Sequence, residues 1–223
     1  MSLTAPKVIL FDWDNTLVDT WPVIHIALNR TLAFMNHEPW SLEKVKQDVK
    51  HSMRDSFPAL FGDCWEIAAD RYQEEYRAIH MEAIQPLPEA EATLIMLADS
   101  PVFVAIVSNK RGPSLRKELD KLQWNAYFKA HVGAHDAERD KPDAAPAHLA
   151  LQNAPVKSGT EIWFVGDTGV DLECAKNIGA TPILYGEHTT DGKMHDGFPF
   201  AAHVRDQGEL RALIGQCLAQ CAA

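Results

Sequence analysis

The stretch that decides the fold is residues 7–20, KVILFDWDNTLVDT, in which four apolar residues lead directly into two carboxylates. Residues 8–11 contain no polar side chain, which is typical of a strand buried on both faces of a parallel sheet. Asp12 and Asp14 follow at the carboxyl end of this predicted strand. Because two carboxylates so close together repel each other, we expect another group to hold or neutralise them.

Further apolar runs have the same character. Residues 102–107 end in Ser108 and Asn109, residues 162–165 end in Gly166 and Asp167, and a weaker run surrounds residues 183–184. Helical patterns at about 113–122, 143–152 and 168–177 lie between them, and residues 201–214 favour a short strand followed by a helix. Strands that alternate with helices predict βαβ units, a parallel sheet and ligands at the carboxyl ends of the strands.

Residues 18–86 interrupt this alternation. Their pattern is helical and contains no convincing strand, and the prolines at 86 and 88 predict a linker before the next helix. We therefore expect a helical subdomain, residues 18–86, inserted into a core formed by residues 1–17 and 87–223.

Composition restricts the function classes. The chain has 223 residues, 46% of them hydrophobic, and a formal net charge of −10, which argues against a broad nucleic-acid surface. No signal peptide is recognisable, and the apolar runs are too short to span a bilayer. The four cysteines form no Cys-x-x-Cys pair, so we expect reduced structural thiols and a cytoplasmic protein.

Polar residues recur where the predicted strands end. Ser108 and Asn109 follow one strand, Asp167 follows another, and Lys141 precedes a predicted helix. Asp171 lies four residues after Asp167, which places the two acids near one helix face at the helix N-terminus. A cation, polar side chains and several acids at one edge of a sheet indicate a functional site.

These motifs resemble those of the haloacid dehalogenase-like hydrolase superfamily, and most closely its phosphoglycolate phosphatase-like subgroup. They match in order: Asp-x-Asp-x-Thr as Asp12-Trp13-Asp14-Asn15-Thr16, then Ser108, then Lys141, then Gly166-Asp167-x-x-x-Asp171. The resemblance implies a Rossmann-like, doubly wound parallel sheet, and it implies that the inserted residues 18–86 form a helical cap. The implied activity is hydrolysis of a small phosphorylated metabolite.

The resemblance also implies a role for each motif residue. Asp12 would be the nucleophile that forms an aspartyl-phosphate, and Asp14 would be general acid and then general base. Ser108 and the backbone of Asn109 would bind phosphoryl oxygens. Lys141 would place a positive charge beside the nucleophile and the transferring group.

A Mg²⁺ ion is the implied cofactor, because hard oxygen ligands surround the expected site. Its ligands would be a carboxylate oxygen of Asp12, the backbone carbonyl of Asp14, and Asp167. Asp171 is expected to support the metal site, directly or through water.

Two residues depart from the usual motif. Asn15 occupies a position where relatives usually carry glycine, but asparagine tolerates a positive φ, so we expect the tight turn to be preserved. Trp13 is larger than the usual aliphatic residue, and we expect it to pack beneath the cap.

The residues that select the substrate are less clearly marked. Lys46, Lys50 and Arg54 repeat every four residues and would form one basic ridge if a single helix carried them. A solvated helix face is one interpretation, and contact of Arg54, with His51, to the substrate is the other. Lys110 is a second candidate for binding a distal anion of the substrate.

Other functions remain open at this level. A sugar phosphomutase would carry His twelve residues after the nucleophile, where this chain has Ile24, with His25 one place later. A non-enzymatic phospho-switch or binding protein would use similar acids, but a receiver domain has no cap. We expect a small phosphorylated metabolite as partner, no nucleic acid or membrane, and a monomer or homodimer.

Overall fold

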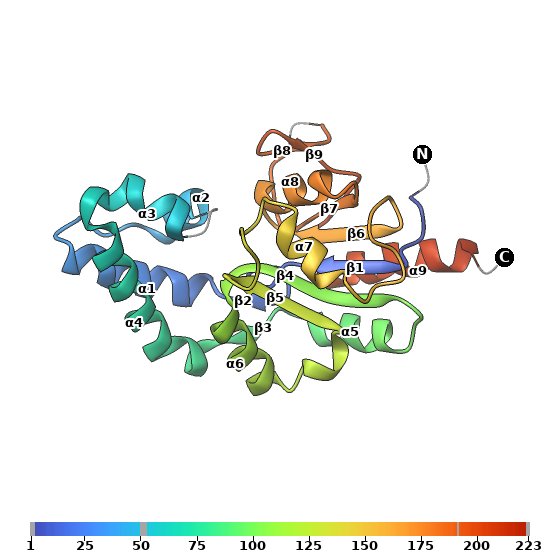
Figure 1. The fold of residues 1–223 in the computed structure, drawn as a ribbon, viewed down its shortest axis with the longest axis horizontal. Coiled ribbons are helices and arrows are strands. Elements are labelled where there is room, and N and C mark those ends of the chain that lie inside the picture. Colours follow the sequence, from blue (N-terminus) through green and yellow to red (C-terminus); the bar gives the residue numbers. More distant parts are fainter. Residues whose placement is uncertain (1–2, 50–52, 191, 222–223) are drawn as a thin grey trace. The chain divides into compact units, whose positions relative to one another are not determined.

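The computed structural model describes residues 3–49, 53–190 and 192–221 (Figure 1). The chain forms two compact units, one of Met1–Val18 with Pro86–Ala223 and one of Asp19–Gln85. The assignment of these parts as catalytic core and substrate-selecting cap stays a prediction.

The first unit is built on a six-stranded parallel sheet. In chain order its strands are β1 (Val8–Phe11), β4 (Phe103–Arg111), β5 (Ala130–Ala134), β6 (Ile162–Gly166), β7 (Thr181–Tyr185) and β10 (Ala202–Val204). In space they run β10-β7-β6-β1-β4-β5, so the direction of winding reverses between β1 and β6. This is the strand order of the doubly wound Rossmann-like fold, and the predicted fold class is confirmed.

Helices of this unit lie between strands of the sheet along the chain: α5 (Ala90–Ala98), α6 (Gly112–Leu122), α7 (Ala145–Ala150) and α8 (Gly169–Asn177). A further helix, α9 (Gln207–Cys221), follows the last strand. A 3-10 turn, η2 (Asn125–Tyr127), precedes β5, and a short hairpin of β8 (Met194–His195) and β9 (Phe198–Pro199) follows β7. Helix α7 is shorter than the predicted 143–152. Strand β5 was not predicted, because AHVGA has no run of large apolar residues.

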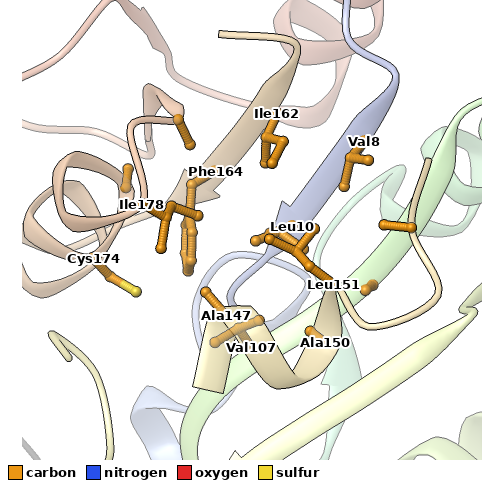
Figure 2. Close-up of a cluster of buried hydrophobic side chains, with 14 of the residues drawn as sticks. Val8, Leu10, Val107, Ala147, Ala150, Leu151, Ile162, Phe164, Cys174 and Ile178 are labelled. Carbon is orange, nitrogen blue, oxygen red and sulfur yellow. The ribbon is translucent and has the colours of Figure 1, made fainter. Parts of the chain in front are cut away.

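The sheet is buried on both faces. Leu10 and Phe164 point toward α7 and α8 and pack with Ala147 and Cys174 (Figure 2). Alternate strand residues point to the opposite face, and Phe11 is fully buried as well. Side chains that point to either face of the sheet must therefore be apolar. This explains why the sequence of β1 does not alternate between polar and apolar residues.

The second unit is helical, as predicted. It contains α1 (Trp21–Phe34), α2 (Leu42–Asp48), α3 (Met53–Phe61), the 3-10 turn η1 (Gly62–Cys64) and α4 (Trp65–Ala83). Its core includes Leu28, Leu32, Val45, Phe57 and Tyr76. Two short strands that were not predicted, β2 (Val18–Asp19) and β3 (Gln85–Pro86), pair where the chain enters and leaves this unit.

The single helix that a basic ridge would require is not present in the described part of this unit. Helix α2 ends at Asp48 and Arg54 lies in the next helix, α3, so no single helix carries Lys46 and Arg54 as one basic ridge. Lys50 and His51 lie outside the described residues.

The described part of the chain has free cysteines and no membrane-spanning helix. Cys64, Cys174 and Cys217 are free thiols there, and burial raises the pKa of Cys174 to about 12. Such a thiol is unreactive at neutral pH, in agreement with a structural role. Within the same ranges, no helix combines the length and apolar character that a bilayer crossing requires.

The burial of the sheet predicts a large loss of stability on truncation of a strand residue. Ile162 in β6 is fully buried, and Ile162→Ala is expected to lower the free energy of unfolding by about 2–5 kcal/mol in urea denaturation. Ile95 in α5 is 49% exposed, so the matched variant Ile95→Ala should stay within about 0.5 kcal/mol of the wild type. Equal losses in the two variants would contradict this description of the core.

Candidate active site

The candidate site lies where the winding of the sheet reverses. In the β1–β6 pairing Phe11 is opposite Val165, so Asp12 and Asp167 leave neighbouring strands at the same edge. The backbone N–H of Asp12 donates to the carbonyl of Val165 (2.9 Å), which continues the pairing to the first acid of the motif. A crevice outside the carboxyl ends of strands at such a switch point is the usual ligand site of this fold.

Lys141 connects the acids at this edge. Its Nζ lies 2.7 Å from Oδ1 of Asp12 and 2.6 Å from Oδ1 of Asp171, and its side chain is only 3% exposed. The loop that carries it is tied to β4 by Asn109, whose Nδ2 donates to the Lys141 carbonyl (3.0 Å) and whose Oδ1 accepts from the Lys141 N–H (2.9 Å). The side chain of Asn109 therefore positions Lys141, a role that the sequence analysis did not assign.

Asp171 has both carboxylate oxygens engaged. Besides the contact of Oδ1 with Lys141, its Oδ2 accepts from the backbone N–H (3.0 Å) and the hydroxyl (2.8 Å) of Thr168, in the capping box of α8. A Cβ at Gly166 would lie 2.3 Å from Cγ of Asp171, which explains why glycine ends β6. Asp171 thus orients Lys141, and whether it binds a metal stays a prediction.

Burial makes this cluster electrostatically unfavourable by itself. Burial, partly offset by Lys141, raises the pKa of Asp12 from 3.8 to about 6. Burial together with the charges of Asp12 and Asp171 raises the pKa of Asp167 well above its usual value. Burial opposes the charged form of Lys141, but the charges of Asp12 and Asp171 outweigh it and raise its pKa. One lysine therefore leaves three buried acids incompletely neutralised.

The donor set fits a divalent cation. One carboxylate oxygen from each of Asp12, Asp167 and Asp171 lies within 4.8 Å of the others. Carboxylate oxygens are the preferred ligands of hard cations, and a positive charge among them would favour the ionised forms that burial disfavours.

The remaining motif residues surround this cluster. Ser108, 3% exposed, lies in β4 two residues after Ile106, the last residue that pairs with β1. The hydroxyl of Thr16 is 3.5 Å from Oδ1 of Asp167, and the buried Gln207 at the start of α9 donates to the Thr16 carbonyl (2.7 Å). Nothing in the sequence marked Gln207, because it belongs to a helix far along the chain from the motif that it supports.

The turn after Asp14 has the predicted geometry. Asn15 has φ of +59°, and its N–H donates to the carbonyl of Val18 (2.7 Å). The expectation that asparagine supplies the left-handed residue usually provided by glycine is confirmed.

Lys110, a predicted substrate contact, is 5% exposed in its side chain. Its Nζ lies 2.6 Å from Oδ1 of Asp14 and 2.6 Å from Oε2 of Glu118. Burial opposes its charge, but the two carboxylates raise its pKa. The structure thus gives this ammonium partners within the protein. Arg54 belongs to α3 in the other unit, its side chain is not described, and its contact with substrate stays a prediction.

The raised pKa of Asp12 predicts that the free energy of unfolding depends on pH when EDTA keeps metal ions from the site. A carboxyl whose pKa rises from 3.8 to about 6 on folding stabilises the protein fully below pH 3.8, and this contribution is lost as the pH rises through about 6. Asp12→Asn cannot titrate, so its stability relative to the wild type should increase between about pH 4 and pH 7. Urea denaturation of both proteins across this range measures the difference, and a difference that is constant with pH would contradict the prediction.

Comparisons with known proteins agree with this geometry. The model of the haloacid dehalogenase-like hydrolase family matches residues 9–184. A phosphoglycolate phosphatase of Aquifex aeolicus is 30% identical over 185 residues, covering 80% of this chain and 84% of that protein. One of Cereibacter sphaeroides is 28% identical and covers 95% of this chain and 99% of that protein.

A solved structure is similar over the whole chain. The crystal structure of a HAD-superfamily hydrolase of Ehrlichia chaffeensis has a TM-score of 0.67 and 25% identity, and covers 97% of this chain and all of that one. The predicted resemblance and the expected enzyme class are confirmed. The protein is an enzyme that belongs to the haloacid dehalogenase-like hydrolase family and is similar to phosphoglycolate phosphatases.

Proposed function

We propose that this protein is a Mg²⁺-dependent phosphatase that hydrolyses a small phosphorylated metabolite through an aspartyl-phosphate. The observation that carries the proposal is the buried contact of the Lys141 ammonium with Asp12, 2.7 Å away, at the switch point of the sheet. A carboxylate in that position faces the crevice with a fixed positive charge beside it, which suits attack on a phosphate.

The proposed reaction has two steps. A carboxylate oxygen of Asp12 attacks the phosphorus, forming an O–P bond as the bond from phosphorus to the leaving oxygen breaks, while Asp14 gives its proton to that oxygen. Asp14 then takes a proton from a water molecule, which attacks the phosphorus and releases Asp12 and inorganic phosphate. The first step needs an ionised Asp12 and a protonated Asp14, so the proposed mechanism requires the two acids to hold different protonation states.

Mg²⁺ would be held by the carboxylates of Asp12 and Asp167 and the backbone carbonyl of Asp14, with Asp171 in support. Bound there, it would supply positive charge that reduces repulsion between these acids and an incoming phosphate dianion. Asp167 is held next to Asp12 by the β1–β6 pairing.

Three groups are proposed to bind the phosphoryl oxygens: the hydroxyl of Ser108, the backbone N–H of Asn109 and the ammonium of Lys141. Their support is the location of Ser108 and Asn109 in β4 beside β1, together with the hydrogen bonds between Asn109 and Lys141. In this arrangement Lys141 contacts the nucleophile and Asp171 keeps it in place.

A phosphoglycolate-like monoester is the proposed substrate class, because the names of the relatives point to it. We further propose that residues 1–17 and 87–223 form the catalytic core and that residues 18–86 form a cap that selects the substrate, with Arg54 as its candidate contact. A cytoplasmic location, and a monomeric or homodimeric state, are part of the same proposal.

Activity should depend on Mg²⁺ and on Asp12. With Mg²⁺ the wild type is expected to release inorganic phosphate from phosphoglycolate, and excess EDTA should abolish this release because the acids would then repel the substrate. Asp12→Asn should reduce turnover to background, since no aspartyl-phosphate can form. A phosphate-release assay with a panel of phosphorylated metabolites measures all three effects. Full activity in EDTA, or in Asp12→Asn, would refute the mechanism.

Asp14→Asn should behave differently from Asp12→Asn. It keeps the backbone carbonyl proposed for metal binding but loses the acid–base group, at a cost of about 10²–10⁴ in rate on alkyl phosphates. Nitrophenyl phosphate needs little protonation of its leaving group, so a burst of nitrophenol followed by slow turnover is expected. Rapid-mixing kinetics with both substrate types resolves the two steps. Wild-type turnover of alkyl phosphates by Asp14→Asn would show that the roles are wrongly assigned.

A further inference from the structure

A second buried charge network adjoins the site and contains an acid for which the reaction has no use. Glu118 on α6 is fully buried, on the same helix face as Leu115 and Leu119. Its Oε2 lies 2.6 Å from Nζ of Lys110 and accepts from the indole N–H of Trp13 (2.7 Å). A carboxylate at such a depth is destabilising unless it is paired, so these partners account for its presence in an apolar helix face.

The same ammonium contacts the proposed acid–base residue. Nζ of Lys110 lies 2.6 Å from Oδ1 of Asp14, so one buried lysine is shared by a fully buried acid and by an acid whose side chain is 23% exposed. Oδ1 of Asp14 is itself buried. The contact therefore holds one oxygen of Asp14 against the protein.

The aromatic residues around Trp13 make this network rigid. The Trp13 ring makes edge-to-face contacts with Trp124 and Phe128, with ring centroids 5.9 Å and 6.5 Å apart. Trp13 stands between the two acids of the motif and cannot shift its indole N–H without disturbing that packing. Its hydrogen bond consequently fixes Glu118, and Glu118 fixes Lys110.

We propose that Glu118 and Lys110 are positioning residues that fix the orientation of the Asp14 carboxylate for proton transfer to the leaving group. This inference rests on the proposed phosphatase reaction. Small displacements of a proton donor reduce the rate of the step that uses it, so the network should matter most for leaving groups that need protonation.

The test uses a double variant that removes the Lys110 and Glu118 charges together, so that Glu118 is not left buried without its cation. Lys110→Met with Glu118→Gln removes both charges, and glutamine keeps an acceptor oxygen for the Trp13 indole. The matched control is Lys7→Met with Glu161→Gln, which removes the exposed 2.7 Å ion pair just before β1 and β6. Glu118→Gln alone provides a milder variant should the double variant fold poorly.

The readout is kcat/KM, which reports the steps up to loss of the leaving group, for three substrates with Mg²⁺. For phosphoglycolate and glycerol 2-phosphate we expect the double variant to lose about tenfold or more. For nitrophenyl phosphate it should stay within about threefold of the wild type. Glu118→Gln should show a smaller loss with the same pattern, and the control variant should show none.

Several results would overturn the inference while leaving the phosphatase proposal intact. An equal loss on all three substrates would indicate a purely structural role. A loss confined to phosphoglycolate would show that Lys110 binds the distal anion of the substrate. Activity like that of the control would show that Asp14 needs no such support. If the wild type hydrolyses no phosphate monoester, the proposed function itself fails, and this inference fails with it.

Discussion

The contact of the Lys141 ammonium with Asp12 and Asp171 is the interaction on which the arrangement of the site depends. Three buried acids have carboxylate oxygens within 4.8 Å of one another, and in their ionised forms they would repel one another without this ammonium. The lysine comes from a loop between β5 and α7, Asp12 follows β1, and Asp171 belongs to α8, so one charged group links three segments far apart in sequence. Asn109 adds β4 to this assembly through its hydrogen bonds with the Lys141 backbone.

The two acids of the opening motif have separate cation partners. Asp12 contacts Lys141, whereas Asp14, two residues on, contacts Lys110, which it shares with Glu118. The Asp12 carboxylate therefore belongs to the buried cluster at the switch point of the sheet. The Asp14 carboxylate belongs to a network with Lys110 of β4 and Glu118 of α6.

Much of the fold and of the candidate site could be predicted from the sequence because the strongest signals are local. The apolar runs of β1 and β6 and the acids after them predicted the sheet and the acidic edge, and the identity of residue 15 predicted its positive φ. Signals that depend on tertiary packing could not be predicted. An acid within an amphipathic helix, such as Glu118, normally faces water, and β5 is too rich in small residues to be recognised. The end of α2 at Asp48 likewise could not be predicted, and because of it Lys46 and Arg54 lie on different helices.

The central claim is that Asp12, held ionised between Lys141 and a divalent cation, accepts the phosphoryl group. The most direct measurement is acid quenching during turnover, followed by borohydride reduction and tandem mass spectrometry of the tryptic peptide of residues 8–30. The account predicts that position 12 alone in this peptide is reduced from aspartyl-phosphate to homoserine. Reduction at position 14, or no reduction at position 12 during turnover, would contradict it.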